Sequence, residues 1–313
     1  MMSSWETRDV PFKFQLSDWT LFQASIRMQL RSIELADAAN PDAIAIPGEI
    51  HLAQDSQGFA LRRQPLDETL PRLARSGPFL RYVPQQYQHC YIDLGTSFDE
   101  YQKKFSSKTR STINRKIRKY TEHCGGALKW HAYRSPDEVP AFFELARMVS
   151  KLTYQEKLLD AGLPDTPEFM ERARALAADG QLRAYVLFDG ERPVSYLYCP
   201  VKDGVAMYAF LGYDPAYMHL SVGTVLQWLV LEQMFDQGDL RYFDFTEGQS
   251  DHKRLFATHQ RQCAHIFLVR PTLRNTAIVR SHALMDRFSG WTGQVLDRYG
   301  VKAKIRRLIR GQG

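Results

Sequence analysis

The chain has 313 residues, of which 44% are hydrophobic and 24% are charged, and its mean hydropathy is −0.38. These values are typical of a globular protein, and they exclude a disordered chain, a collagen-like fibre and a small disulfide-rich protein. No stretch reaches the roughly 18 consecutive apolar residues of a membrane span. The first residues lack the apolar run of a secretory signal, so we expect a cytoplasmic protein.

Basic residues are concentrated in two zones of a chain whose net charge is +6. Residues 103–119 hold eight basic residues and no acid, and residues 270–313 hold ten basic residues and two acids. Such zones attract phosphates, nucleic acid, anionic lipid or an anionic cofactor. A solvated helix face is the simpler interpretation of either zone, and both interpretations stay open.

The segment before residue 125 reads as a mixture of strands and helices. Residues 12–16 and 88–94 have the composition of strands, and residues 23–39 have that of a helix. Ser97 begins a further helix that leads into the first basic zone, with Glu100 completing a capping box. The apolar stripe expected along this helical region consists of Phe105, Ile113, Ile117 and Tyr120.

Gly125-Gly126 ends this segment and marks the expected domain boundary. A strand at 128–133 follows, and then two helices. The first helix opens at Ser135-Pro136, with the proline in its first turn, and the second opens at Thr166-Pro167 and ends near Gly180.

Three strand signals come next and form an antiparallel meander. Asp189-Gly190 and Asp203-Gly204 are strong hairpin-turn signals between them. The three strands are 182–188, 193–199 and 205–213.

The last part of this region alternates helices and strands. The pattern predicts a helix over 222–237, a strand over 240–245, a short helix over 250–258 and a strand over 264–270, with two helical stretches in the tail. Antiparallel strands followed by a β-α-β crossover predict an α/β (α+β) fold with a mixed, mostly antiparallel sheet flanked by helices.

The start of the 222–237 helix has the small residues of an anion site. Ser221 is at the N-cap, and Val222, Gly223 and Thr224 form the first turn. Without a side chain at Gly223, an anion such as a pyrophosphate can approach the unpaired backbone N–H groups. An ordinary N-cap explains the same residues.

Acidic and basic side chains are clustered after the 240–245 strand. Asp244, Glu247, His252 and Lys253 lie within ten residues of sequence. Such a group can accept a proton from an attacking amine and stabilise developing negative charge. Turn chemistry and solvated helix charges are the alternative.

These segments resemble the GNAT superfamily of acyl-CoA transferases, in particular the BioF- or CelD-like branch, whose members are relatives of the Fem aminoacyl transferases. The segments that carry the resemblance are FDEYQKKFSSKTRSTINRKIRK, SVGTVLQWLVLEQMFDQG and YFDFTEGQSDHKRLFA. Two positions depart from the family pattern. His252 stands where the branch usually has Tyr, and only Gly223 remains of the usual phosphate loop.

The resemblance implies that the strands at 205–213 and 240–245 diverge. The pantetheine arm of acetyl-CoA or another acyl-CoA would then bond to the first strand at Leu211 and Gly212, with its pyrophosphate on the turn at 221–224. An amine would attack the thioester directly. The implied roles are Asp244 or Glu247 as base, Lys253 as charge stabiliser and His252 or Tyr213 as acid.

The implied domains are a degenerate GNAT-like lobe at 1–125, a catalytic domain at 126–270 and a basic helical tail at 271–313. The expected acceptor is a small-molecule or peptide amine, with an anionic one favoured by the basic zone at 103–119. The amphipathic segment 300–310 fits peripheral contact with the inner face of a membrane.

Two other functions remain as alternatives. The first is a Fem-like transferase that uses aminoacyl-tRNA, and the second is a non-enzymatic protein that binds nucleic acid or a membrane surface. Nucleic acid is not the expected partner, because the basic zones have few interleaved aromatic residues.

No metal is expected either. The nine histidines form no ligand pattern, and the cysteines, which lack CxxC spacing, are expected to be reduced thiols. They are Cys90, Cys124, Cys199 and Cys263.

Overall fold

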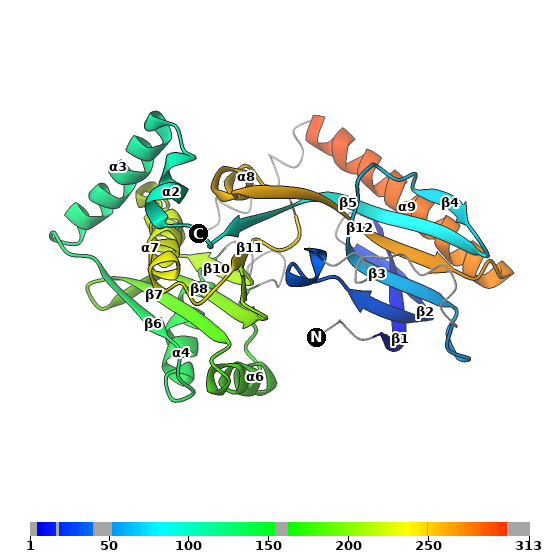
Figure 1. Ribbon diagram of the computed structural model, residues 1–313, viewed down its shortest axis with the longest axis horizontal. Coiled ribbons are helices and arrows are strands. Elements are labelled where there is room, and N and C mark those ends of the chain that lie inside the picture. Colours follow the sequence, from blue (N-terminus) through cyan, green and yellow to red (C-terminus); the bar gives the residue numbers. More distant parts are fainter. Residues whose placement is uncertain (1–4, 17–18, 40–51, 154–161, 249, 299–313) are drawn as a thin grey trace. The chain divides into compact units, whose positions relative to one another are not determined.

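The computed structural model describes residues 5–16, 19–39, 52–153, 162–248 and 250–298 (Figure 1). The chain divides into two compact units. Unit 1 is formed by the chain up to Tyr87 and from Gln262 onward, and unit 2 is formed by Gln88–Arg261. The described residues form twelve strands, which pair mostly antiparallel. The α/β fold with a mixed, mostly antiparallel sheet is therefore confirmed, whereas the boundaries placed after residues 125 and 270 stay predictions.

Unit 1 begins with a long antiparallel hairpin. Strand β1 (Glu6–Leu16) pairs with β2 (Trp19–Ser32) from Glu6↔Leu30 to Leu16↔Trp19. The helix expected over 23–39 is therefore wrong, and only a short 3-10 turn, η1 (Ala36–Ala39), is helical. Helix-favouring residues are abundant here, but the buried residues alternate with period two, and burial of one sheet face outweighs local propensity. The buried side chains are Ile26, Met28 and Leu30.

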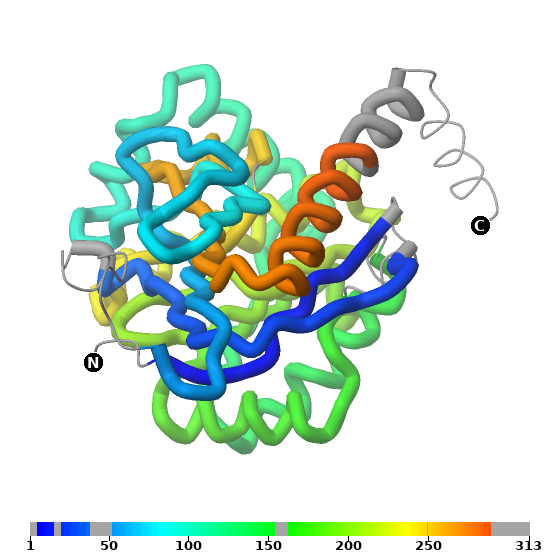
Figure 2. The backbone as a smooth tube through the Cα atoms, turned by 90° about the vertical axis from the view of Figure 1, so that its right-hand side faces the viewer, coloured from blue at the N-terminus to red at the C-terminus, as the bar shows by residue number. Residues whose placement is uncertain are grey.

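The rest of unit 1 completes a sheet covered by one long helix. The remaining strands are β3 (Gly58–Pro65), β4 (Leu73–Ser76), the first part of β5 (Phe79–Asp93) and most of β12 (His259–Val269). Helix α9 (Leu273–Arg298) packs on β1, as the orange helix beside the blue strands in Figure 2 shows. Its buried residues Val279 and Ala283 join a core with Phe12 and Tyr82.

Unit 2 is built on a sheet in the order β5-β11-β9-β8-β7-β6, with β10 also pairing with β8. The strands are β6 (Lys129–Tyr133), β7 (Leu182–Asp189), β8 (Arg192–Lys202), β9 (Val205–Met207), β10 (Phe210–Tyr213) and β11 (Tyr242–Asp244). The predicted meander of β7, β8 and the strand after it is confirmed. At the second hairpin both Asp203 and Gly204 have the positive φ of a type I′ turn.

Helices cover both faces of the unit 2 sheet (Figure 1). One face packs against α2 (Phe98–Lys103), α3 (Ser107–His123) and α7 (Val222–Gln237), and the other against α4 (Val139–Ser150) and α6 (Pro167–Ala178). The residues of the predicted apolar stripe do face this core, since Phe105, Ile113 and Tyr120 are buried and Ile117 packs against it. The single helix expected to carry them is divided, because Phe105 lies between α2 and α3. Helix α8 (Asp251–Phe256) follows β11.

Capping explains where these helices begin. Ser97, Ser106, Thr166 and Ser250 each accept a hydrogen bond from a backbone N–H of the first turn. The helix expected to open at Ser135-Pro136 instead begins at Val139. Residues 134 and 135 form a turn that is closed by Glu138, because Glu138 Oε2 accepts both of their backbone N–H groups at 2.9 Å.

The tail contains one described helix, α9, and the amphipathic segment 300–310 lies outside the described residues. Within the described part, no helix is long and apolar enough to cross a bilayer. Within the described residues, no disulfide bond joins any of the four cysteines.

Candidate functional site

The strand expected over 205–213 is divided into two strands, β9 and β10, which both pair with β8 but differ on their other side. β9 pairs in parallel with β11 over Val205–Met207, and the N–H of Tyr208 donates to the Asp244 carbonyl at 2.8 Å. β10 continues the pairing with β8, but it no longer pairs with β11. The two strands that the resemblance expects to diverge therefore do so after Tyr208.

One edge of β10 faces the space opened by this divergence. In an antiparallel pair, the backbone groups of alternate residues face the partner strand. The N–H of Asp214 donates to β8 at 2.9 Å, so Gly212, two residues earlier, faces β8 as well. The N–H and C=O groups of Leu211 and Tyr213 consequently face the opposite edge, where no described strand is paired with β10.

The start of helix α7 lies beside this edge. The short 3-10 helix η2 (Pro215–Leu220) leads to Ser221, which has a left-handed φ of 56° and makes no capping bond through its side chain. The amides of Val222 and Gly223 have no carbonyl one turn before them in the helix, so they point outward as donors. Together with the helix dipole, they favour an anion at this end of α7.

A pocket of about 350 Å³ joins the β10 edge to the start of α7. It collects five of the six residues predicted to bind the cofactor, and two of the five predicted as catalytic. Its lining residues are Tyr208, Leu211, Tyr213, Met218, Ser221, Val222, Gly223, Thr224 and His252. Gly223 borders the pocket, and a Cβ there would lie 3.4 Å from the side chains of Leu211 and Tyr213.

Gly212 is the predicted cofactor residue that does not line this pocket. A Cβ at Gly212 would lie 2.3 Å from the ring of Tyr196, so no larger residue fits. The physical requirement for glycine here is the packing of β10 against β8.

His252 enters the pocket from α8. Its Nε2 lies 2.6 Å from Oε1 of Gln227, a side chain of α7 with no exposed surface. Burial lowers the pKa of His252, and the nearby positive charges of Lys116 and Lys253 lower it further. The ring is thus neutral at pH 7, a state in which imidazole can accept a proton.

Asp244 lies in the interior, next to a residue that the sequence reasoning missed. Its Oδ1 is 2.6 Å from Nε2 of His89, and both side chains are 1% exposed. The N–H of Thr246 also donates to this oxygen, at 2.6 Å, and Nε of Arg261 donates to His89 Nδ1 at 3.3 Å. These bonds hold the chain as it leaves β11, and they keep the carboxylate away from solvent.

Lys253 and Glu247 are joined through the backbone. Lys253 Nζ donates to the Glu247 carbonyl at 2.6 Å, which closes the turn after β11. Burial lowers the pKa of Lys253, while Cys90, Asp244 and Glu247 oppose that shift. Lys253 therefore supplies a half-buried positive charge beside His252.

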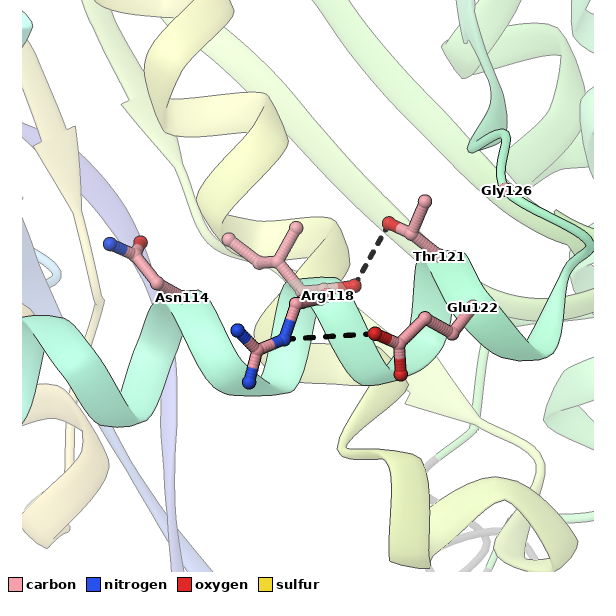
Figure 3. A pocket seen from close by; sticks show the side chains of 6 residues that line it. Asn114, Arg118, Thr121, Glu122 and Gly126 are labelled. Carbon is pink, nitrogen blue, oxygen red and sulfur yellow. Dashed lines mark hydrogen bonds and ion pairs between the residues drawn. The ribbon is translucent and has the colours of Figure 1, made fainter.

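Helix α3 brings basic side chains to the same region. Lys119 Nζ donates to the carbonyl of His219 in η2 at 3.2 Å, and Lys116 lies near enough to His252 to affect its pKa. A separate hollow of about 400 Å³ lies on α3 and is drawn in Figure 3. There Arg118 pairs with Glu122 at 3.7 Å along the helix, and no predicted site residue lines that hollow.

The sequence reasoning missed four residues of this region: Tyr208, Met218, Gln227 and His89. Gln227 carried a detectable signal. It precedes Leu231 and Phe235 by one and two helical turns, so it shares a face of α7 with these two buried apolar residues. His89 carried none, since its partner is 155 residues away in sequence. Within the described residues, no group of three or more acidic, histidine or cysteine side chains could hold a metal ion.

Residues 107–254 match the family model described as an acetyltransferase (GNAT) domain, and no curated protein matches the sequence. Among solved structures, L-PGS from Bacillus licheniformis is 13% identical, with 72% of each chain covered and a TM-score of 0.45. FemX is 11% identical, with 84% of this chain and 88% of FemX covered and a TM-score of 0.49. Residues 107–254, which lie within unit 2, are thus similar to an acetyltransferase domain of the GNAT type.

Proposed function

We propose that this chain transfers an acyl group from acyl-CoA to an amine by direct attack on the thioester. The observation that carries the proposal is the divergence of β9–β10 from β11 directly beside the start of α7. A strand edge with unsatisfied backbone groups binds an extended amide chain as an added strand would. The pantetheine arm of coenzyme A is such a chain, because it contains two amides.

The pocket would fix the orientation in which the donor binds. Its amides would bond to the backbone of Leu211 and Tyr213, and its pyrophosphate would accept from the N–H groups of Val222 and Gly223. The thioester would then lie on the side of the pocket where His252 enters. Holding both reactants in this way supplies much of the rate enhancement of a direct transfer.

We propose that the acceptor molecule carries an acidic group in addition to its amine. Lys116 of α3 and Lys253 of α8 both place positive charge near His252. Lys119 adds a third cation near η2. These charges would attract an acidic group and disfavour a polycation. Raised ionic strength should therefore increase the Michaelis constant of the acceptor, and an unchanged constant would contradict this part of the proposal.

The test compares two donors and one variant. Binding of acetyl-CoA and of S-acetylpantetheine, which lacks the nucleotide and the pyrophosphate, is measured by calorimetry on the wild type and on Gly223→Ala. The added methyl group reaches ordinary contact distance from Leu211 and Tyr213, and alanine favours the helix by up to about 1 kcal/mol. The ligand-free variant should consequently be at least as stable as the wild type.

The expected result is a selective loss. Acetyl-CoA should bind the wild type more tightly than S-acetylpantetheine does, and Gly223→Ala should reduce this difference about tenfold or more, because the methyl group obstructs the pyrophosphate. A wild type that binds neither donor, or binds charged tRNA instead, would overturn the proposal. A variant that retains the full preference would remove the start of α7 from the donor site.

A further inference from the structure

Gln227 is an amide placed where a hydrocarbon would be expected. It lies on α7 between the buried residues Leu226 and Trp228, and its own side chain has no exposed surface. Burying an amide is unfavourable unless it gains a hydrogen-bond partner. Its Oε1 bonds to His252 at 2.6 Å, while its Nε2 finds no hydrogen-bond partner among the described residues. Its single strong contact is therefore with a ring that lines the pocket.

This contact determines which nitrogen of His252 carries the proton. A carbonyl oxygen can only accept, so Nε2 of His252 must be the protonated nitrogen, and Nδ1 keeps its lone pair. The surroundings also disfavour a second proton on the ring. Phe256 packs against His252 with 4.8 Å between ring centroids, and the charged groups nearby are the cations Lys116 of α3 and Lys253 of α8.

We propose that Gln227 is a positioning residue, which holds His252 as the Nε2–H tautomer so that Nδ1 takes the proton from the acceptor amine. This inference rests on the proposed acyl transfer and adds to it the residue that moves the proton and the residue that orients it. The bond to Gln227 fixes both the tautomer and the direction of the ring, as a carboxylate or carbonyl does for a histidine base in other enzymes.

The proton follows a closed path in this scheme. The amine nitrogen attacks the thioester carbonyl and forms the C–N bond, and its proton passes to Nδ1 of His252. The tetrahedral intermediate then breaks its C–S bond, and the imidazolium returns the proton to the leaving thiolate. An amide and a thiol are released, and His252 ends in its starting state, so one residue acts first as base and then as acid.

The test uses two substitutions at one position and a control on the same helix. Gln227→Met keeps the length of the side chain but cannot accept the bond, and Gln227→Glu can only accept it. Gln237→Met is the control, because Gln237 is exposed, bonds to Arg134 and lies outside the pocket.

We expect Gln227→Met to lower kcat by at least about tenfold, with acetyl-CoA affinity within twofold of the wild type. Gln227→Glu should retain most of kcat and move the acidic limb of the pH profile to higher pH, since a carboxylate stabilises the imidazolium. Gln237→Met should behave as the wild type. A Gln227→Met enzyme with unchanged kcat and an unchanged pH profile would overturn the proposal.

A second measurement is independent of the donor. In ¹⁵N NMR of the ligand-free protein, assigned with a His252→Gln variant, the wild-type ring should give the Nε2–H pattern, and Gln227→Met should give a mixture of tautomers. A wild-type ring protonated on Nδ1 would refute the positioning role whether or not acyl-CoA is the donor. If the wild-type ring is protonated on Nε2 but the protein binds no acyl-CoA, the proposed function is wrong and the positioning role of Gln227 stands.

Discussion

Replacing His89 by leucine should destabilise unit 2 strongly, although His89 does not line the pocket. The substitution nearly preserves volume, so it creates little cavity. What it removes is the hydrogen bond at 2.6 Å to Asp244, where both side chains are 1% exposed. The carboxylate keeps the N–H of Thr246 as a donor, but it loses its ring partner in a place that water does not reach.

The expected loss follows from the type of bond. Hydrogen bonds to charged groups contribute about 1.5–3 kcal/mol, and breaking a fully buried ion pair costs about 3–5 kcal/mol. His89 accepts from Arg261 at its other nitrogen, so it acts as a neutral donor to Asp244, and the lower range applies. We therefore expect the free energy of unfolding to fall by about 2–3 kcal/mol.

The assay is urea denaturation followed by circular dichroism at pH 7, with His131→Leu as the matched control. His131 lies 3.4 Å from Glu138, but these two side chains are 57% and 38% exposed. An exposed pair of this kind contributes at most about 1 kcal/mol. The denaturant slope should stay the same in both variants, because the surface exposed on unfolding does not change.

Equal losses for the two histidine variants would refute the reasoning. Such a result would mean that the buried carboxylate gains as much from its other contacts as from His89. A double-mutant cycle with Asp244→Asn measures the coupling directly, and we expect a coupling energy above about 1 kcal/mol for residues in contact.

The remaining predictions concern charge and pH. Lys253→Ala should lower turnover about 100-fold by removing a positive charge beside the site, without unfolding the protein, and wild-type turnover would exclude Lys253 from the mechanism. Acyl transfer should decline as the pH falls through the pKa of His252, which lies below its ordinary value of 6.5, and a pH–rate profile checks this. Because the unfolded chain binds this proton more readily, the same shift should make the folded state gain stability as the pH rises toward 6.5. Glu138→Gln should lower the free energy of unfolding by about 1 kcal/mol at pH 7, after allowance for partial exposure. The reason is that two backbone N–H groups and a hydroxyl hold the pKa of Glu138 at about 2. In acid denaturation, this contribution should disappear as the pH falls from about 4.5 toward 2. The segment 300–310 should make the chain co-sediment with anionic vesicles but not with neutral ones, and equal sedimentation with both would reject an electrostatic membrane contact.

Much of unit 2 was predictable because its signals are local. The capping serine at Ser97, the hairpin turn at Asp203-Gly204 and the periodicity of α7 each involve residues a few positions apart. The composition of the turn at 221–224 indicated an anion site before any geometry was known, and all four of its residues line one pocket.

The wrong predictions arose where local and long-range preferences conflict. The residues of β2 favour a helix, but the alternating row of Ile26, Met28 and Leu30 is buried only when the segment pairs with β1. The continuous apolar run of 205–213 likewise hides the break at Tyr208, because that break depends on which neighbours the two halves find in the sheet.

The sequence by itself determined the type of fold, most elements of unit 2 and most of the residues around the pocket. Only the tertiary structure decided what those residues can do. It buries Asp244 against His89, and it places Gln227 behind the ring of His252. These pairs are separated by 155 and 25 residues. The physical reason is that burial and hydrogen-bond partners set the charge and reactivity of a side chain, and both are properties of packing that no local pattern of residues encodes.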